Sequence, residues 1–147
     1  MGAVDDMIAR WKRVDMSQII NTAVLRNENQ VLNLNRQSQL KNRGIGEDGE
    51  QITPLYHPRT IQQKRQKGQT TKFVTLRDTG QFHENFKIIY RTDSIEITAS
   101  PTNRNGKDLT IHLQGRYGKH IFGLIDENVI RTRKIIKPAI LQQLRNV

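Results

Sequence analysis

Four histidines are the side chains in this sequence best suited to acid–base or metal chemistry. They are His57, His83, His112 and His120. None of them forms the four-residue pair that places two metal ligands on one helical face, and no HExxH motif accompanies them. The chain has no cysteine, which excludes thiolate metal ligands, disulfides and cysteine nucleophiles. The pattern therefore predicts no metal site, no cofactor and no catalytic residue.

Other catalytic and phosphate-binding motifs give the same answer. The phosphate-binding motif GxxxxGK[ST] does not occur, and Gly44-Ile45-Gly46 lies among acidic residues that would repel a phosphate. No serine has the sequence context of a nucleophile elbow. An acid–base pair of His83 with Glu84 stays open, and a small hydrolase using His83 or His120 is the least favoured alternative. We expect a protein that is not an enzyme.

Positive charge is concentrated in two blocks of the chain. The formal net charge is +10, but residues 51–77 contain six basic and no acidic residues, and residues 131–147 contain five basic and no acidic residues. Such blocks attract polyanions, so nucleic acid or an acidic protein face is an expected neighbour. A solvated basic face is the alternative. The candidates for polyanion contact are Arg59, Lys64, Arg65 and Lys67.

The composition indicates a small core that does not cover the whole chain. Hydrophobic residues make up 35% and aromatic residues 5% of the sequence, while 11 Asn and 13 Gln supply many neutral amides for the surface or for interfaces. No run of about 18 apolar residues predicts a membrane span. The first 30 residues lack the apolar stretch of a signal peptide, so we expect a soluble, cytoplasmic protein without a membrane partner.

The longest helical pattern covers residues 17–41. Its apolar stripe is narrow, and a narrow stripe suits packing against another helix or a neighbouring subunit. The alternative is that the helix folds back on its own domain. The candidates for subunit contact are Ile20, Val24, Val31 and Leu34. A shorter helix is expected over residues 5–13, with Met7, Ile8 and Trp11 on one side.

Residues 1–50 read as a helical extension that ends in an acidic, glycine-rich flexible loop, and residues 51–147 as an α+β domain. In that domain a basic helix is expected from Thr60 to Gly68. Alternating apolar residues then predict an antiparallel pair of strands that meet at Thr92-Asp93.

Two helices are expected after this hairpin. Residues 108–117 fit a strand or a helix, and we favour a helix that ends at Gly118. Asp126 is expected to cap a final amphipathic helix, which Pro138 must kink or split.

Two short motifs resemble a known family. Residues 76–82, Leu-Arg-Asp-Thr-Gly-Gln-Phe, resemble the L-x-D-T-G-x-L/F segment of tailed-phage virion-morphogenesis proteins, the Mu-like tail-completion and head–tail joining family. Residues 122–128, Phe-Gly-Leu-Ile-Asp-Glu-Asn, are similar to that family's F-L-G-L-S/T-D-E-D segment. The resemblance covers about residues 54–146. The motif residues are Asp78, Thr79, Gly80, Phe82, Phe122, Gly123 and Asp126.

The resemblance implies a short helix after the Asp-Thr-Gly turn, with Phe82 packed on the sheet. It implies a structural virion protein at the head–tail junction (neck, tail-completion or tail-terminator ring), assembled in the host cytoplasm. Its partners would be copies of itself in a ring, other junction or tail proteins, and genomic DNA in the channel. We therefore expect an α+β fold, with a small antiparallel sheet, a C-terminal helix packed on it and N-terminal helices that extend to neighbours. The alternative from another class is a small basic nucleic-acid-binding protein.

Overall fold

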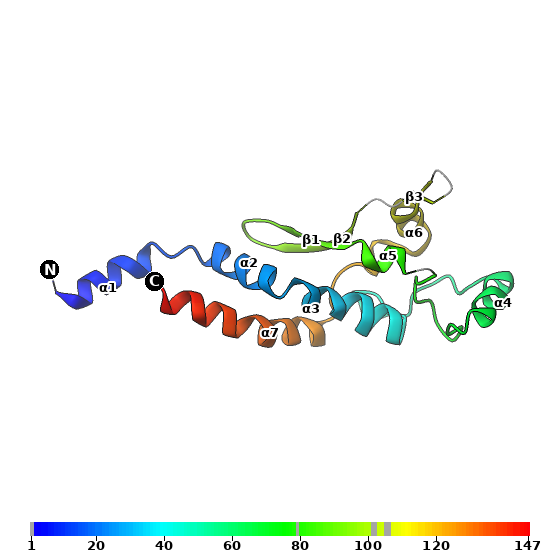
Figure 1. Ribbon diagram of the computed structural model, residues 1–147, viewed down its shortest axis with the longest axis horizontal. Helices are drawn as coiled ribbons and strands as arrows, with labels where there is room; N and C mark the ends of the chain where they lie inside the picture. Colours follow the sequence, from blue (N-terminus) through cyan, green and yellow to red (C-terminus); the bar gives the residue numbers. More distant parts are fainter. Residues whose placement is uncertain (1, 79, 101–102, 105–106) are drawn as a thin grey trace.

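The computed structural model describes residues 2–78, 80–100, 103–104 and 107–147, and it has the expected α+β fold (Figure 1). Thr79, one of the motif residues, lies outside the described residues. A β-hairpin, a line of N-terminal helices and the C-terminal helix lie side by side along the long axis. Helix α1 projects at one end of the molecule, and α4 lies at the other.

The N-terminal segment is helical almost throughout. The predicted helix over 17–41 is present but divided into three consecutive elements, and the short first helix is also present. The bounds are α1, Ala3–Lys12; α2, Met16–Arg26; α3, Glu28–Asn33; and η1, Leu34–Lys41. The division between α2 and α3 falls at Asn27, whose φ of −119° and ψ of 23° lie outside the helical range. Its side-chain amide donates to the Ala23 carbonyl at 2.9 Å, which satisfies an acceptor at the break.

The C-terminal helix α7, Asp126–Arg145, packs mainly against α2, while α3 contacts both α7 and the sheet. It runs antiparallel to α2 (Figure 1). One expectation for this helix was wrong: Asp126 is its first residue and not its cap, because Ile125 occupies the cap position. Of the two effects expected of Pro138, a split is excluded, because the helix continues through this residue. Asp126 still stabilises this end, since a carboxylate in the first turn faces the positive end of the helix dipole.

The hairpin is confirmed with its predicted strands. Strand β1, Phe86–Tyr90, pairs antiparallel with β2, Ile95–Ala99. Arg91 donates its backbone N–H to the Ser94 carbonyl at 2.9 Å, so Thr92-Asp93 is the two-residue connection. A second small pair, β3 (Asn103–Arg104) and β4 (Lys107–Asp108), follows.

Short helices gather beyond the hairpin, at the end away from α1 (Figure 1). Their bounds are α4, Pro58–Gln66; α5, Gln81–Glu84; α6, Leu109–Tyr117; and η2, Lys119–Ile121. The helix predicted from Thr60 is confirmed as α4, and the helical alternative for residues 108–117 is confirmed as α6. Asp108 caps α6 by accepting from the backbone amides of Thr110 and Ile111. Gly118, with φ of 93°, ends it in a conformation that side-chain-bearing residues rarely adopt.

One core joins the N-terminal segment to the rest of the chain. Val24 and Val31, two candidates for subunit contact, are 1% and 0% exposed inside it. That interpretation was wrong for both residues, because the α2–α3 stripe folds back on the hairpin and α7. Leu34 is half-buried, and Ile20 at 39% exposure is the candidate that stays on the surface.

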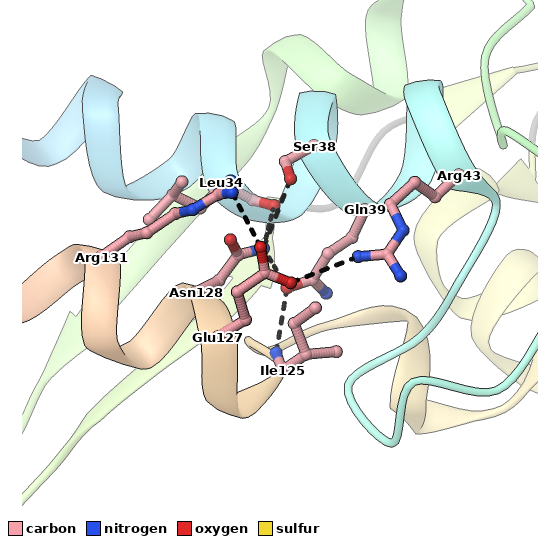
Figure 2. A network of polar contacts seen from close by, with 8 residues as sticks. All are labelled: Leu34, Ser38, Gln39, Arg43, Ile125, Glu127, Asn128 and Arg131. Atoms are coloured by element: carbon pink, nitrogen blue, oxygen red, sulfur yellow. Dashed lines mark hydrogen bonds and ion pairs between the residues drawn. The ribbon is translucent and has the colours of Figure 1, made fainter.

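The core contains a network of amide side chains (Figure 2). Asn35 and Gln39 lie one above the other on η1, a π-helix, and both are fully buried. Asn35 donates to the Ile121 carbonyl at 3.1 Å and accepts from the Gly123 amide at 2.8 Å. Gln39 repeats the pattern two residues further along, donating to the Gly123 carbonyl at 2.9 Å and accepting from the Ile125 amide at 3.0 Å.

Asn128 completes this network from α7. Its side-chain amide donates to the Gln39 side chain at 2.9 Å and to the Leu34 carbonyl at 3.2 Å (Figure 2). These amides give the extended segment after η2 the hydrogen bonds that a neighbouring strand would supply. Part of the amide-rich composition therefore serves the interior and not the surface.

Candidate docking cleft

A cleft of about 310 Å³ opens between α4, the turn over residues 76–81 and α6. Its interior combines aromatic and aliphatic side chains, and basic and amide side chains line its edge. The apolar lining residues are Tyr56, Leu76, Phe82, Leu109, Leu113 and Tyr117. The polar lining residues include Gln63, Lys67, Arg77, Asp78, Gln81 and His112. The first motif of the family resemblance thus forms one wall of the cleft.

The turn that forms this wall has a fixed and strained backbone. Leu76 has a φ of 56°, the left-handed region that a bulky residue rarely occupies, and it is 6% exposed. The hydroxyl of Tyr56 accepts from the amides of Thr75 and Leu76 at 2.9 and 3.3 Å, which holds both residues in place. Such a conformation costs about 1–3 kcal/mol and is kept only where surrounding contacts hold the residue in place. The wall is therefore preformed.

Helix α4 holds the same turn from the other side. The Lys64 ammonium donates to the Arg77 carbonyl at 2.7 Å and lies 4.7 Å from the centre of the Tyr56 ring. Gln69 donates to the Asp78 carbonyl at 2.7 Å, and Lys67 forms an ion pair with the Asp78 carboxylate. The basic residues of α4 that face the turn therefore position the motif.

The four candidates for polyanion contact differ in their exposure and in their partners. Lys64 is 6% exposed, so its choice as a polyanion contact was wrong: its charge is directed inward at a backbone carbonyl. Lys67 is exposed but is paired with Asp78. Arg59 and Arg65 are exposed on α4 and stay available to an anionic partner.

Phe82, which lines the cleft, belongs to an aromatic cluster that joins the two motifs. The ring of Phe82, on α5, lies 5.2 Å from that of Phe86 on β1 and 5.9 Å from that of Phe122. Phe82 therefore packs on the sheet, as the resemblance implied. Gly80, with φ of 91°, immediately precedes α5 and allows the sharp entry to it. Gly123 has φ of 112°, and a Cβ there would lie 2.6 Å from the Glu47 side chain.

The histidines do not assemble a reactive centre. His83 is 5% exposed beside this cluster, and its Nε2 donates to the Thr75 carbonyl at 2.9 Å, so it is absent from the cleft lining. Burial, together with the charges of nearby Arg77 and Arg36, lowers the pKa of His83 to about 4. Its Nδ1 has no hydrogen-bond partner. A neutral, enclosed imidazole of this kind is poorly suited to general-base catalysis, which needs contact with substrate.

The acidic loop over residues 44–50 packs against the chain and forms no phosphate site. Its sequence GIGEDG matches the spacing GxGxxG, but it follows a helix and opens none, so the strand–loop–helix context of a dinucleotide site is missing. A Cβ on Gly46 would lie 2.4 Å from His120 Nδ1, so the glycine permits close contact. His120 contacts Asp48 at 3.1 Å and the Tyr117 carbonyl at 2.8 Å. The hydrogen bond to His120 lowers the pKa of Asp48.

A second exposed surface lies on α1. Four apolar side chains occupy one face of this helix, and none of its residues is buried. They are Val4, Met7, Ile8 and Trp11, with exposures between 45 and 62%. Apolar residues at positions i, i+3, i+4 and i+7 form a stripe that a folded helix normally buries against a partner. In the part of the chain that the structure describes, this stripe stays about half exposed.

The sequence pattern identified three of these α1 residues and placed Leu76 in the first motif, but it did not predict the left-handed backbone of Leu76 or the hydrogen bonds of Tyr56. Among the described residues, no group of three or more histidines and carboxylates could hold a metal ion. No helix in that part of the chain is long and apolar enough to cross a bilayer. No family model, curated protein or solved structure matches this chain.

Proposed function

We propose that the protein is a structural component of a phage virion at the head–tail junction, where copies of it assemble into a ring between head and tail. The family resemblance supplies the class of protein. Phe82 and Phe122, from the two motifs far apart in the sequence, pack together beneath one cleft, which supports reading both motifs as parts of one structural unit. In this role the chain is assembled in the host cytoplasm and acts through contacts and not through catalysis.

The observation that carries the proposal is the exposed apolar face of α1. A helix of 10 residues with no buried side chain gains little stability from its own chain, because isolated helices of this length are marginal in water. Trp11, at 50% exposure, is the largest of its apolar residues. Aromatic side chains of this kind dominate the energetics of protein interfaces. The helix is built to be covered by another subunit.

Arg59 and Arg65 give the ring subunit a place for a polyanion. Both are exposed on α4, in a stretch of the chain with no acidic residue between positions 51 and 77. In a ring they would face the DNA passage or an acidic face of the next ring. The C-terminal basic block on α7 adds a second positive surface, with Arg133, Lys134 and Lys137 exposed.

Mass measurement of the purified protein tests this proposal. We expect a multiple of the 17.0 kDa subunit mass, alone or after addition of portal, neck and tail proteins of the same virion, and closed rings in electron micrographs. The protein should also be found in purified virions. A monomer that joins no virion component under any condition contradicts the proposal.

The exposed arginines favour one second candidate, a nucleic-acid-binding protein. Such a protein would bind DNA or RNA as a monomer, with an affinity that falls steeply as salt is raised. The double variant Arg59→Glu/Arg65→Glu would then lose binding, while Arg43→Glu, an equally exposed arginine that pairs with Glu127, would change it little. For the ring subunit we expect the arginine pair to leave self-association intact and to weaken only contact with DNA or an acidic partner.

A further inference from the structure

We propose that helix α1 of one copy docks into the cleft of a second copy, so that the chain associates head to tail. This inference rests on the proposed function and adds to it the contact that joins neighbouring subunits. The cleft is the one between α4, the 76–81 turn and α6, and the docking face is the apolar stripe of α1.

The helix face and the interior of the cleft are both apolar. Ile8 and Trp11 are three residues apart, so both side chains point to the same side of α1, and Val4 extends the stripe by one turn. An amphipathic helix that places such anchors in an apolar groove is a recurring mode of protein recognition. The cleft offers an apolar interior lined by Tyr56, Leu109 and Leu113 among others. An apolar interior of this kind suits the apolar face of a helix.

The occupant must come from another molecule. Helix α1 projects from one end of the long axis, and α4 and α6 lie towards the opposite end (Figure 1). The connection from α1 to α2 is only residues 13–15, which span at most about 11 Å when extended. A chain therefore cannot place its own α1 in its own cleft.

The charges of the two surfaces are complementary over the first turn of α1. Asp5 and Asp6 lie in that turn, whereas Arg10 and Lys12 lie in the last turn. The cleft lies against α4, from the stretch 51–77 that has basic residues and no acid, and Arg77 is exposed at its edge. Asp78 also lines the cleft, where it is paired with Lys67. Opposite charges favour the encounter and fix the direction in which the helix lies. Because the two surfaces differ, the contact is heterologous, and its repetition closes a ring or continues as a filament.

Cysteine cross-linking tests this contact directly, because the chain has no cysteine of its own. The variants Ile8→Cys on α1 and His112→Cys in the cleft each carry one thiol, and both positions are exposed. One variant carries a tag, and the two are mixed and treated with a short bis-maleimide, alone and with head–tail junction proteins. We expect the yield of the mixed covalent dimer to be about ten times that of a control pair. The control pair is Ile8→Cys with Ile130→Cys, and Ile130 lies on the exposed side of α7.

A second variant measures the strength of the contact. Trp11→Asp leaves the core intact, because no residue of α1 is buried, and we expect it to weaken self-association at least about tenfold. Ile130→Asp, at 51% exposure like Trp11, is the matched control and should associate normally. An oligomer that survives Trp11→Asp and gives no excess of the mixed dimer overturns this inference and leaves the ring proposal standing. A protein that stays monomeric in every mixture overturns both.

Discussion

At the scale of single residues, the molecule uses its polar side chains mainly to fix its own backbone. Tyr56 and Lys64 hold the strained turn at Leu76, and Gln39 supplies hydrogen bonds to the segment that follows η2. His83 belongs to the same class, since its imidazole donates to the Thr75 carbonyl from an enclosed aromatic site. These residues are of types that often carry chemistry, and here each of them forms a hydrogen bond with the backbone.

His83 makes stability depend on pH in a defined window. Its pKa is about 4 in the folded chain and close to 6.5 in the unfolded chain, so between these values the unfolded state binds more protons. We expect the free energy of unfolding to fall by about 3 kcal/mol as pH drops from 6.5 to 4, measured by denaturant titration at several pH values. His83→Gln should remove most of this dependence of the free energy of unfolding on pH. His112→Gln, at an exposed position, should not. If the free energy of unfolding of His83→Gln falls with pH as steeply as that of the unchanged chain, His83 is not the cause of the pH dependence.

At the scale of elements, the π-helical stretch η1 decides how α7 begins. Asn35 and Gln39 lie four residues apart on it, and their side-chain oxygens accept hydrogen bonds from the extended segment before α7. The charged pair Arg43 and Glu127 closes the same junction at 3.7 Å on the surface (Figure 2). The buried amides contribute more than this exposed pair, because exposed ion pairs are worth little.

Gln39→Met tests this junction. The change keeps the length of the side chain but leaves the Gly123 carbonyl and the Ile125 amide without their partner, so we expect a loss of about 3 kcal/mol in the free energy of unfolding. Chemical denaturation measures it. Gln37→Met, on the exposed side of η1, is the control and should change stability by less than about 0.5 kcal/mol. Equal effects of the two variants would show that the network adds no stability.

At the scale of the whole molecule, α1 is a helix that takes no part in the hydrophobic core. The core joins residues of α2, α3 and η1 to the hairpin, the cleft and α7, whereas α1 contributes none of its side chains. A hydrogen bond of 3.4 Å joins exposed Arg10 of α1 to the carbonyl of Val147. Helix α1 is therefore separate from the folded body, and its apolar face is the surface on which the proposed assembly depends.

Removal of residues 1–14 should therefore leave the monomer as stable as before. At concentrations at which the chain does not self-associate, we expect the free energy of unfolding to change by less than about 0.5 kcal/mol, because no buried residue of α1 is lost. The thermal midpoint and the denaturant midpoint both measure this. A loss of several kcal/mol would show that α1 packs on its own chain in solution.

The sequence by itself determined the elements whose patterns are local. Alternation of apolar residues gave β1 and β2, and the glycine at position 68 indicated where the helix α4 ends to within two residues, because period and backbone restriction act within a few residues. It could not give the burial of Val24 and Val31, since a stripe that suits a neighbouring subunit suits α7 equally. It could not give the roles of Lys64, Gln39 or Leu76 either. These depend on which backbone carbonyl or hydroxyl arrives from a distant part of the chain, and only the tertiary structure decides that.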